Sequence, residues 1–139
     1  MIEKSKKEIE RWEEKLEELL SKKPELISNV AKNKNIREKG VYAISRPDTH
    51  KIIYVGKTKT KSIQGRMKDH LQHKHGDTDS DLANMVIKRE KLPQNYSDYL
   101  VRYLSINEPR DRMRFEMFAI SVLDPALNKD DNKAPLKRK

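Results

Sequence analysis

The sequence predicts an α+β fold, in which a small antiparallel sheet of about three strands is flanked by helices and preceded by an N-terminal helical extension. Apolar residues recur every three or four positions over residues 5–23, as in an amphipathic helix. Two short apolar runs, residues 40–45 and 52–56, enclose the turn-rich segment 46–50 and indicate a β-hairpin. An alternating run over residues 99–106 adds a strand, and 139 residues are enough for one core.

The N-terminal extension is predicted to contain two helices, over residues 5–23 and 24–35, with Pro24 at their junction because proline interrupts a helix. The apolar face of the first helix combines four residues: Ile9, Trp12, Leu16 and Leu19. This face can pack on its own domain or on a second copy of the chain. The stripe covers fewer heptads than a coiled coil usually needs. We therefore expect packing within the domain, and a homodimer stays open as the alternative.

Three further helices are expected after the hairpin. Ser62 fits the N-cap of a helix that runs to about residue 75, where Gly76 ends it. A helix over residues 82–92 follows a polar loop. A long helix over residues 109–122 begins with a proline, which suits a first helical turn.

The chain divides into three parts. Residues 1–39 are the helical extension, residues 40–130 the α+β domain, and residues 131–139 a basic tail. The apolar runs are too short to span a bilayer, and the absence of cysteine gives no sign of a disulfide framework. We therefore expect a cytoplasmic protein with no membrane partner.

The chain is strongly basic, with a formal net charge of +9. A charge of this size favours polyanionic partners, although lysines can also serve only to keep a surface soluble. The positive residues are concentrated just after the second hairpin strand, where Asp69 is the single acid. The candidates for contacting phosphate or DNA in this stretch are Lys57, Lys59, Lys61 and Lys68.

The two hairpin strands carry matching tripeptides, Gly40-Val41-Tyr42 and Tyr54-Val55-Gly56. Two tyrosines on neighbouring strands beside a cationic helix can form a pocket that handles phosphate. Arg66 and His70 are four residues apart and so project from one face of that helix. Arginine matches phosphate oxygens with a planar fork of donors, and histidine can orient or move a proton near neutral pH. Most Arg–His pairs at this spacing are solvated surface, and the position after the hairpin is what singles this pair out.

Glu116 lies in an otherwise mostly apolar helical stretch. A carboxylate that is buried there needs a partner, and a hard divalent cation is one such partner. The alternative is an exposed glutamate paired with Arg112 four residues earlier. Asn128 follows the break at Pro125, where it can be a turn residue or can hold a neighbouring group in place.

Taken together, these residues resemble the catalytic module of the GIY-YIG nuclease superfamily, in its restriction-endonuclease-like branch. Valine replaces isoleucine in both tripeptides, and the match covers roughly residues 40–130. The resemblance implies a set of catalytic positions in this order: Tyr42, Tyr54, Arg66, His70, Glu116 and Asn128. Residues 1–39 are not covered by it.

The resemblance implies metal-dependent hydrolysis of phosphodiester bonds in double-stranded DNA, with one Mg²⁺ ion, or Mn²⁺ in its place, held by Glu116. Tyr42 is the candidate general base, and a phenol with an ordinary pKa near ~10 must be helped by nearby cations to lose its proton at neutral pH. A restriction or mobile-element role is expected. The alternative is a nucleic-acid-binding module that keeps the fold without catalysis.

Overall fold

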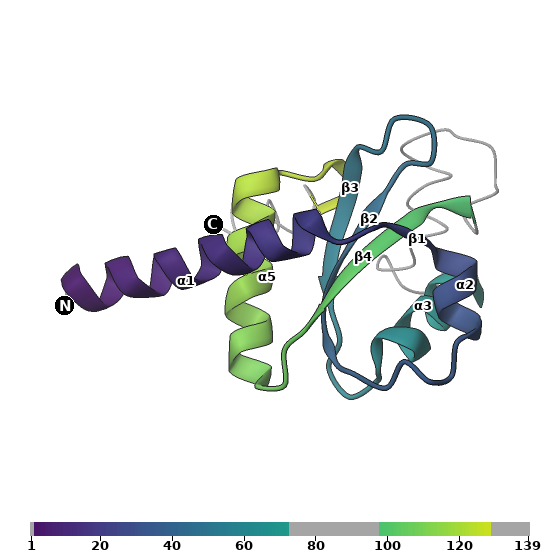
Figure 1. Cartoon of the computed structure of the whole chain (residues 1–139), viewed down its shortest axis with the longest axis horizontal. Coiled ribbons are helices and arrows are strands. Elements are labelled where there is room, and N and C mark those ends of the chain that lie inside the picture. Colours follow the sequence, from purple (N-terminus) through teal and green to yellow (C-terminus); the bar gives the residue numbers. More distant parts are fainter. Residues whose placement is uncertain (1, 73–97, 129–139) are drawn as a thin grey trace, which may run out of the picture.

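The residues that the structure describes, 2–72 and 98–128, form a four-stranded antiparallel sheet with helices packed on both faces (Figure 1). The structure is a computed structural model. Its elements in chain order are α1 (Ile2–Ser21), β1 (Glu25–Leu26), α2 (Ile27–Lys32), β2 (Gly40–Ser45), β3 (Ile52–Lys57), α3 (Ile63–Gln72), β4 (Leu100–Ser105), α5 (Pro109–Leu123) and the 3-10 helix η3 (Ala126–Asn128). The strand order is β1-β4-β2-β3. This confirms the predicted α+β class with an N-terminal helix.

Strand β2 forms the centre of the sheet, and all six of its residues are buried. It pairs with β3 on one side and with β4 on the other, so that Tyr42 lies opposite Gly56 in β3. The β2–β3 register shifts after Ile44, which pairs with Tyr54, and this shift leaves Ile53 as a bulged residue. Residues Tyr42, Ile44 and Tyr54 therefore lie on the same face of the sheet.

Each face of the sheet carries its own hydrophobic core. Helices α2 and α3 cover the face that holds the two hairpin tyrosines, with Ile27, Val30, Ile63 and Met67 among the buried side chains. Helices α1 and α5 cover the other face. Since β2 alternates between the two cores, its tyrosine belongs to the α3 side.

Helix α1 packs on its own domain, as expected from its apolar stripe. Trp12, Leu16 and Leu19 are buried in the same core cluster as Phe115 of α5, and the rings of Trp12 and Phe115 lie 6.1 Å apart between centroids. The prediction was wrong for Ile9, which is 50% exposed because this N-terminal part of the helix lies beyond the core. Figure 1 shows the N-terminal turns of α1 projecting beyond α5.

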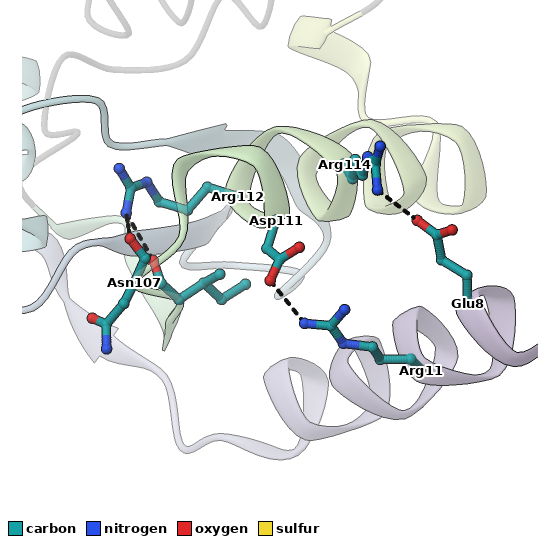
Figure 2. Close-up of polar contacts among 7 residues, drawn as sticks. Glu8, Arg11, Asn107, Asp111, Arg112 and Arg114 are labelled. Atoms are coloured by element: carbon teal, nitrogen blue, oxygen red, sulfur yellow. Dashed lines mark hydrogen bonds and ion pairs between the residues drawn. The ribbon is translucent and has the colours of Figure 1, made fainter.

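Two ion pairs of opposite sense join α1 to α5 (Figure 2). Arg11 of α1 lies 2.8 Å from Asp111 of α5, and Glu8 of α1 lies 3.3 Å from Arg114 of α5. Exposed pairs of this kind contribute at most about 1 kcal/mol each. They fix the register of the two helices more than they stabilise the fold, which depends on the buried side chains between them.

The structure corrects the prediction for residues 24–35. A helix was expected over the whole segment, but Glu25 and Leu26 instead form strand β1, which pairs with β4 as a fourth strand. The amide of Ile27 then donates to the carbonyl of Tyr99, 2.9 Å away, and the helix begins only at that residue. The predicted helix over residues 82–92 and the tail 131–139 lie outside the described residues. Among residues 2–72 and 98–128, none of the helices combines the length and apolarity needed to cross a bilayer.

Candidate active site

Two tyrosines of the hairpin meet a histidine of α3 at one point on the sheet. The hydroxyl of Tyr42 lies 2.8 Å from Nε2 of His70, within hydrogen-bond distance. The ring of Tyr54 completes a triangle, with centroids 6.2 Å from Tyr42 and 5.8 Å from His70. All three side chains are buried. The antiparallel hairpin and the helix that follows it therefore bring together three of the predicted site residues.

The two glycines of the tripeptides are required by close approach. A Cβ at Gly56 would lie 2.5 Å from the hydroxyl oxygen of Tyr42 and 2.9 Å from the ring of Tyr54. A Cβ at Gly40 would collide with the backbone carbonyl of Leu104 in the neighbouring strand. Gly56 thus makes the room in which the two tyrosines lie, and Gly40 lets β2 approach β4.

Burial sets the protonation of the Tyr42–His70 pair. Burial, and next the neighbouring Tyr54, raise the pKa of Tyr42 well above 10.0, although the charge and hydrogen bond of Arg66 act in the opposite direction. Burial, and next the charge of Arg66, lower the pKa of His70 from 6.5 to about 3. At neutral pH the phenol keeps its proton and the imidazole is neutral.

A basic pocket of about 250 Å³ opens at Arg66, whose positive charge also acts on the pKa of Tyr42. Its lining consists of Lys57, Lys59, Thr60, Lys61, Arg66 and Asp69. Lys61 pairs with Asp69 at 2.6 Å. Lys59 has no ion-pair partner within the described ranges 2–72 and 98–128. Arg66 is thus the link between the solvent-accessible pocket and the buried tyrosine.

Glu116 of α5 reaches the edge of this pocket through Lys57. Its Oε1 lies 3.2 Å from the ammonium nitrogen of Lys57, and the two side chains are 17% and 25% exposed. Its charge also contributes to raising the pKa of Tyr42, after burial and Tyr54. The alternative pairing with Arg112 is not what the structure has, because Arg112 points into the protein and bonds backbone carbonyls.

The side chain of Asn128 hydrogen-bonds the backbone of the edge strand β3. Its Oδ1 accepts from the amide of Val55 at 2.7 Å, and its Nδ2 donates to the carbonyl of Val55 at 3.0 Å. Strand β3 is at the edge of the sheet, and this side-chain amide takes the place of a further strand for one residue. Val55 lies between Tyr54 and Gly56 in the chain, so Asn128 holds the hairpin close to the point where the tyrosines meet.

A family model described as the GIY-YIG catalytic domain matches residues 38–129, more than half of the chain. The chain belongs to the GIY-YIG family. A GIY-YIG catalytic domain is a nuclease-type domain, so a nucleic acid is the class of substrate that it implies. Neither the curated proteins nor the solved structures gave a match.

Sequence reasoning did not identify Arg112 as a site-supporting residue of this GIY-YIG domain. Its buried guanidinium, on α5, donates to the carbonyls of Thr58 at 3.0 Å, Lys59 at 3.2 Å, Ile106 at 2.9 Å and Asn107 at 2.7 Å. Figure 2 shows it turned away from the α1 interface and toward Asn107. The arginine therefore ties the start of the lysine-rich segment after β3 to the loop before α5. The sequence pattern that could have indicated its burial is that Arg112 lies three residues before Phe115, on the same face of the helix.

Thr58 is a second residue of this kind. It is buried, its Oγ1 accepts from the amide of Gly40 at 3.0 Å, and its own amide donates to the carbonyl of Gly40 at 2.9 Å. The side chain extends the β2–β3 pairing by one step beyond Lys57. Together with Arg112, it holds the segment that carries three pocket lysines.

The candidate site thus joins most of the predicted residues, but not all of them. Tyr42, Tyr54, Arg66 and His70 form one connected group, and Glu116 approaches it through its ion pair. Lys68 is not part of the pocket, because it projects from the opposite flank of α3 into a groove beside α2.

Proposed function

We propose that this chain is a metal-dependent endonuclease that hydrolyses phosphodiester bonds in double-stranded DNA. The observation that carries the proposal is the buried Tyr42–His70 hydrogen bond, which Arg66 connects to a lysine-lined pocket. The pocket supplies cations for the phosphate, and Arg66 is placed to stabilise the negative charge that develops on it. Tyr54 packs against the ring of Tyr42 and orients it.

In this proposal the reactive form of Tyr42 is the phenolate, which is the general base that accepts a proton from the attacking water. Holding an ordinary phenol as phenolate at neutral pH costs about 4 kcal/mol, and burial raises that cost here. Arg66 acts in the direction that the base needs, because it lowers the pKa of the phenol. His70 is a positioning residue and not a proton store, since its pKa of about 3 makes the imidazolium unfavourable.

Glu116 is proposed to hold the divalent metal, Mg²⁺ or Mn²⁺. The residues fit this ion: Mg²⁺ is usually bound by one or two carboxylates and completes its shell with water and substrate phosphate. When bound, the metal would neutralise charge on the leaving oxygen. Lys57, now paired with Glu116, would then be released toward the phosphate.

The test is nicking of supercoiled plasmid DNA with Mg²⁺ and with Mn²⁺. We expect Glu116→Gln, Arg66→Lys and Tyr42→Phe each to lower the rate at least about 100-fold, as losses of acid–base or electrostatic groups do. The matched control is Glu13→Gln, which removes an exposed carboxylate of α1 and should leave the rate unchanged. Full activity in Glu116→Gln would remove the metal assignment.

Two observations favour the alternative, a nucleic-acid-binding module without catalysis: Tyr42 is fully buried, and Lys57 neutralises Glu116. Salt-dependent DNA binding with no cleavage in either metal would support that function. If cleavage occurs, the biological role is the next question. Digestion of a mixed DNA library with end sequencing distinguishes a restriction role from a mobile-element role. We propose the restriction role, because Arg66 and His70 stand one turn apart and Asn128 closes the segment after Glu116, as in the restriction-endonuclease-like branch that the sequence resembles.

A further inference from the structure

Helix α3 separates the basic pocket from a second basic hollow. This hollow, the α2–α3 groove, has a volume of about 390 Å³ and is lined by Ala31, Lys32, Lys34, Gln64, Lys68 and Leu71. Among the lining residues that the structure describes, half are lysines and none is acidic. The pocket on the other flank of the helix contains Asp69 among its lysines. The α2–α3 groove therefore has the more uniform positive character.

The groove is preformed. The side-chain amide of Gln64 donates to the carbonyl of Ala31 at 2.5 Å and so ties α3 to α2. Both helices also pack into the same core cluster. Its three lysines, Lys32, Lys34 and Lys68, have no ion-pair partner in the part of the chain that the structure describes, whereas Lys57 and Lys61 of the pocket are paired. Their charges are available to a ligand.

Gly65 gives a second, independent indication. Successive helical residues are about 100° apart, so Gly65 lies on the ridge of α3 between Gln64, which lines the groove, and Arg66, which lines the pocket. A Cβ there would make only ordinary contacts, 3.6 Å to Cβ of Lys61 and to Oγ of Ser62, and no glycine of the described residues has positive φ. The fold does not require glycine here, although glycine weakens a helix. A ligand that passes close to the helix backbone would require it.

We propose that the phosphate backbone of the nucleic-acid substrate crosses α3 at Gly65 and is held at a second point by Lys32, Lys34 and Lys68 in the α2–α3 groove. The inference rests on the nucleic-acid substrate of the proposed function. Lys32 and Lys34 precede the family match at residue 38, so this part of the binding surface belongs to the N-terminal segment.

The first test measures binding of the full chain to a fluorescein-labelled DNA duplex by anisotropy, without divalent metal, over a series of salt concentrations. The double variant Lys32→Gln/Lys34→Gln should reduce the slope of log K against log salt by about 1.8, since each lost phosphate contact removes about 0.9. The control Lys6→Gln/Lys7→Gln removes the same charge from exposed positions of α1 and should leave the slope within about 0.3 of the wild type. Equal slopes in the two double variants would overturn the groove contact.

The second test uses Gly65→Ala. Because alanine fits the helix, the variant should raise the melting temperature by about 1–4 °C, and because its methyl group stands on the crossing ridge, it should weaken duplex binding at least about 5-fold, or roughly 1 kcal/mol. A folding defect cannot produce this combination. A higher melting temperature with unchanged affinity would contradict the crossing at Gly65.

The two proposals fail separately. If the wild type cuts no DNA but the groove variant still loses its salt slope, the groove contact stands and the nuclease proposal falls. If the wild type cuts DNA and the groove variant binds like the control variant, the groove contact falls alone.

Discussion

At the residue scale, the centre of the candidate site is a histidine that the fold keeps neutral. His70 is buried between two tyrosines, and burial together with Arg66 lowers its pKa from 6.5 to about 3. An unfolded chain would bind a proton at this histidine below pH 6.5, and the folded chain would not. The histidine therefore makes stability depend on pH in a window that ordinary acid denaturation of carboxylates only partly overlaps.

We predict that His70 lowers stability as the pH falls from 6.5 to about 3. Between these values the unfolded state binds more protons than the folded state, so the free energy of unfolding falls by up to about 1.4 kcal/mol per pH unit from this group. His70→Gln, which can still accept from the Tyr42 hydroxyl, should remove this part of the slope in urea denaturation at several pH values. His50→Asn is the control, since that residue is exposed in the hairpin turn with φ of 62°, a conformation that asparagine tolerates. Equal slopes for wild type and His70→Gln would show that the histidine is already accessible to protons.

The sequence predicted the candidate site residues whose own side-chain groups suit the proposed reaction. Tyr42, Arg66 and Glu116 carry groups that a phosphodiester reaction needs, and their spacing places them on neighbouring elements. It did not reach Thr58 and Arg112, because these residues act on backbone carbonyls and amides. A backbone acceptor leaves no trace in the sequence, so such a partner is visible only once the chain is folded.

At the scale of elements, Arg112 joins three segments: α5, the loop before it and the segment after β3. We predict that Arg112→Met costs roughly 2–5 kcal/mol of unfolding free energy, because buried carbonyls lose their donor at about 1–3 kcal/mol each. Arg114→Met, on the exposed side of the same helix, should cost about 1 kcal/mol or less. Chemical denaturation of both variants measures the difference. Equal small losses would mean that water replaces the guanidinium at those carbonyls.

The elements that sequence reasoning misplaced are short. Strand β1 has two residues, too few for an alternating pattern to register, and it exists because β4 offers it a free edge. Helix α2 is correspondingly shorter than the apolar residues of 24–35 suggested. Long elements such as α1 and α5 were predictable because their periodicity repeats over several turns. Short ones are decided by their neighbours in the fold.

At the scale of the whole molecule, the segment before residue 38 is part of the structure that supports the GIY-YIG match. Helix α1 closes one face of the sheet with Trp12, Leu16 and Leu19, and β1 extends the sheet at its edge. Burying three large apolar side chains contributes roughly 5–9 kcal/mol, which is comparable with the entire stability of a typical domain, about 5–15 kcal/mol. The catalytic module and the N-terminal helix should therefore unfold together.

We predict that a chain lacking residues 1–23 loses the single cooperative thermal transition of the full chain, because Phe115, Ala119 and Ile120 of α5 would be left uncovered. A chain lacking only residues 1–7 is the control, since it keeps Glu8, Arg11 and every core residue of α1, and it should melt within a few degrees of the full chain. Calorimetry measures both transitions, and light scattering gives the mass of each chain. A truncated chain of residues 24–139 that melts cooperatively at the full-length temperature would show that α1 is dispensable for folding. If its mass per particle were also halved relative to the full chain, α1 would instead be a dimerisation helix whose apolar face meets a second copy.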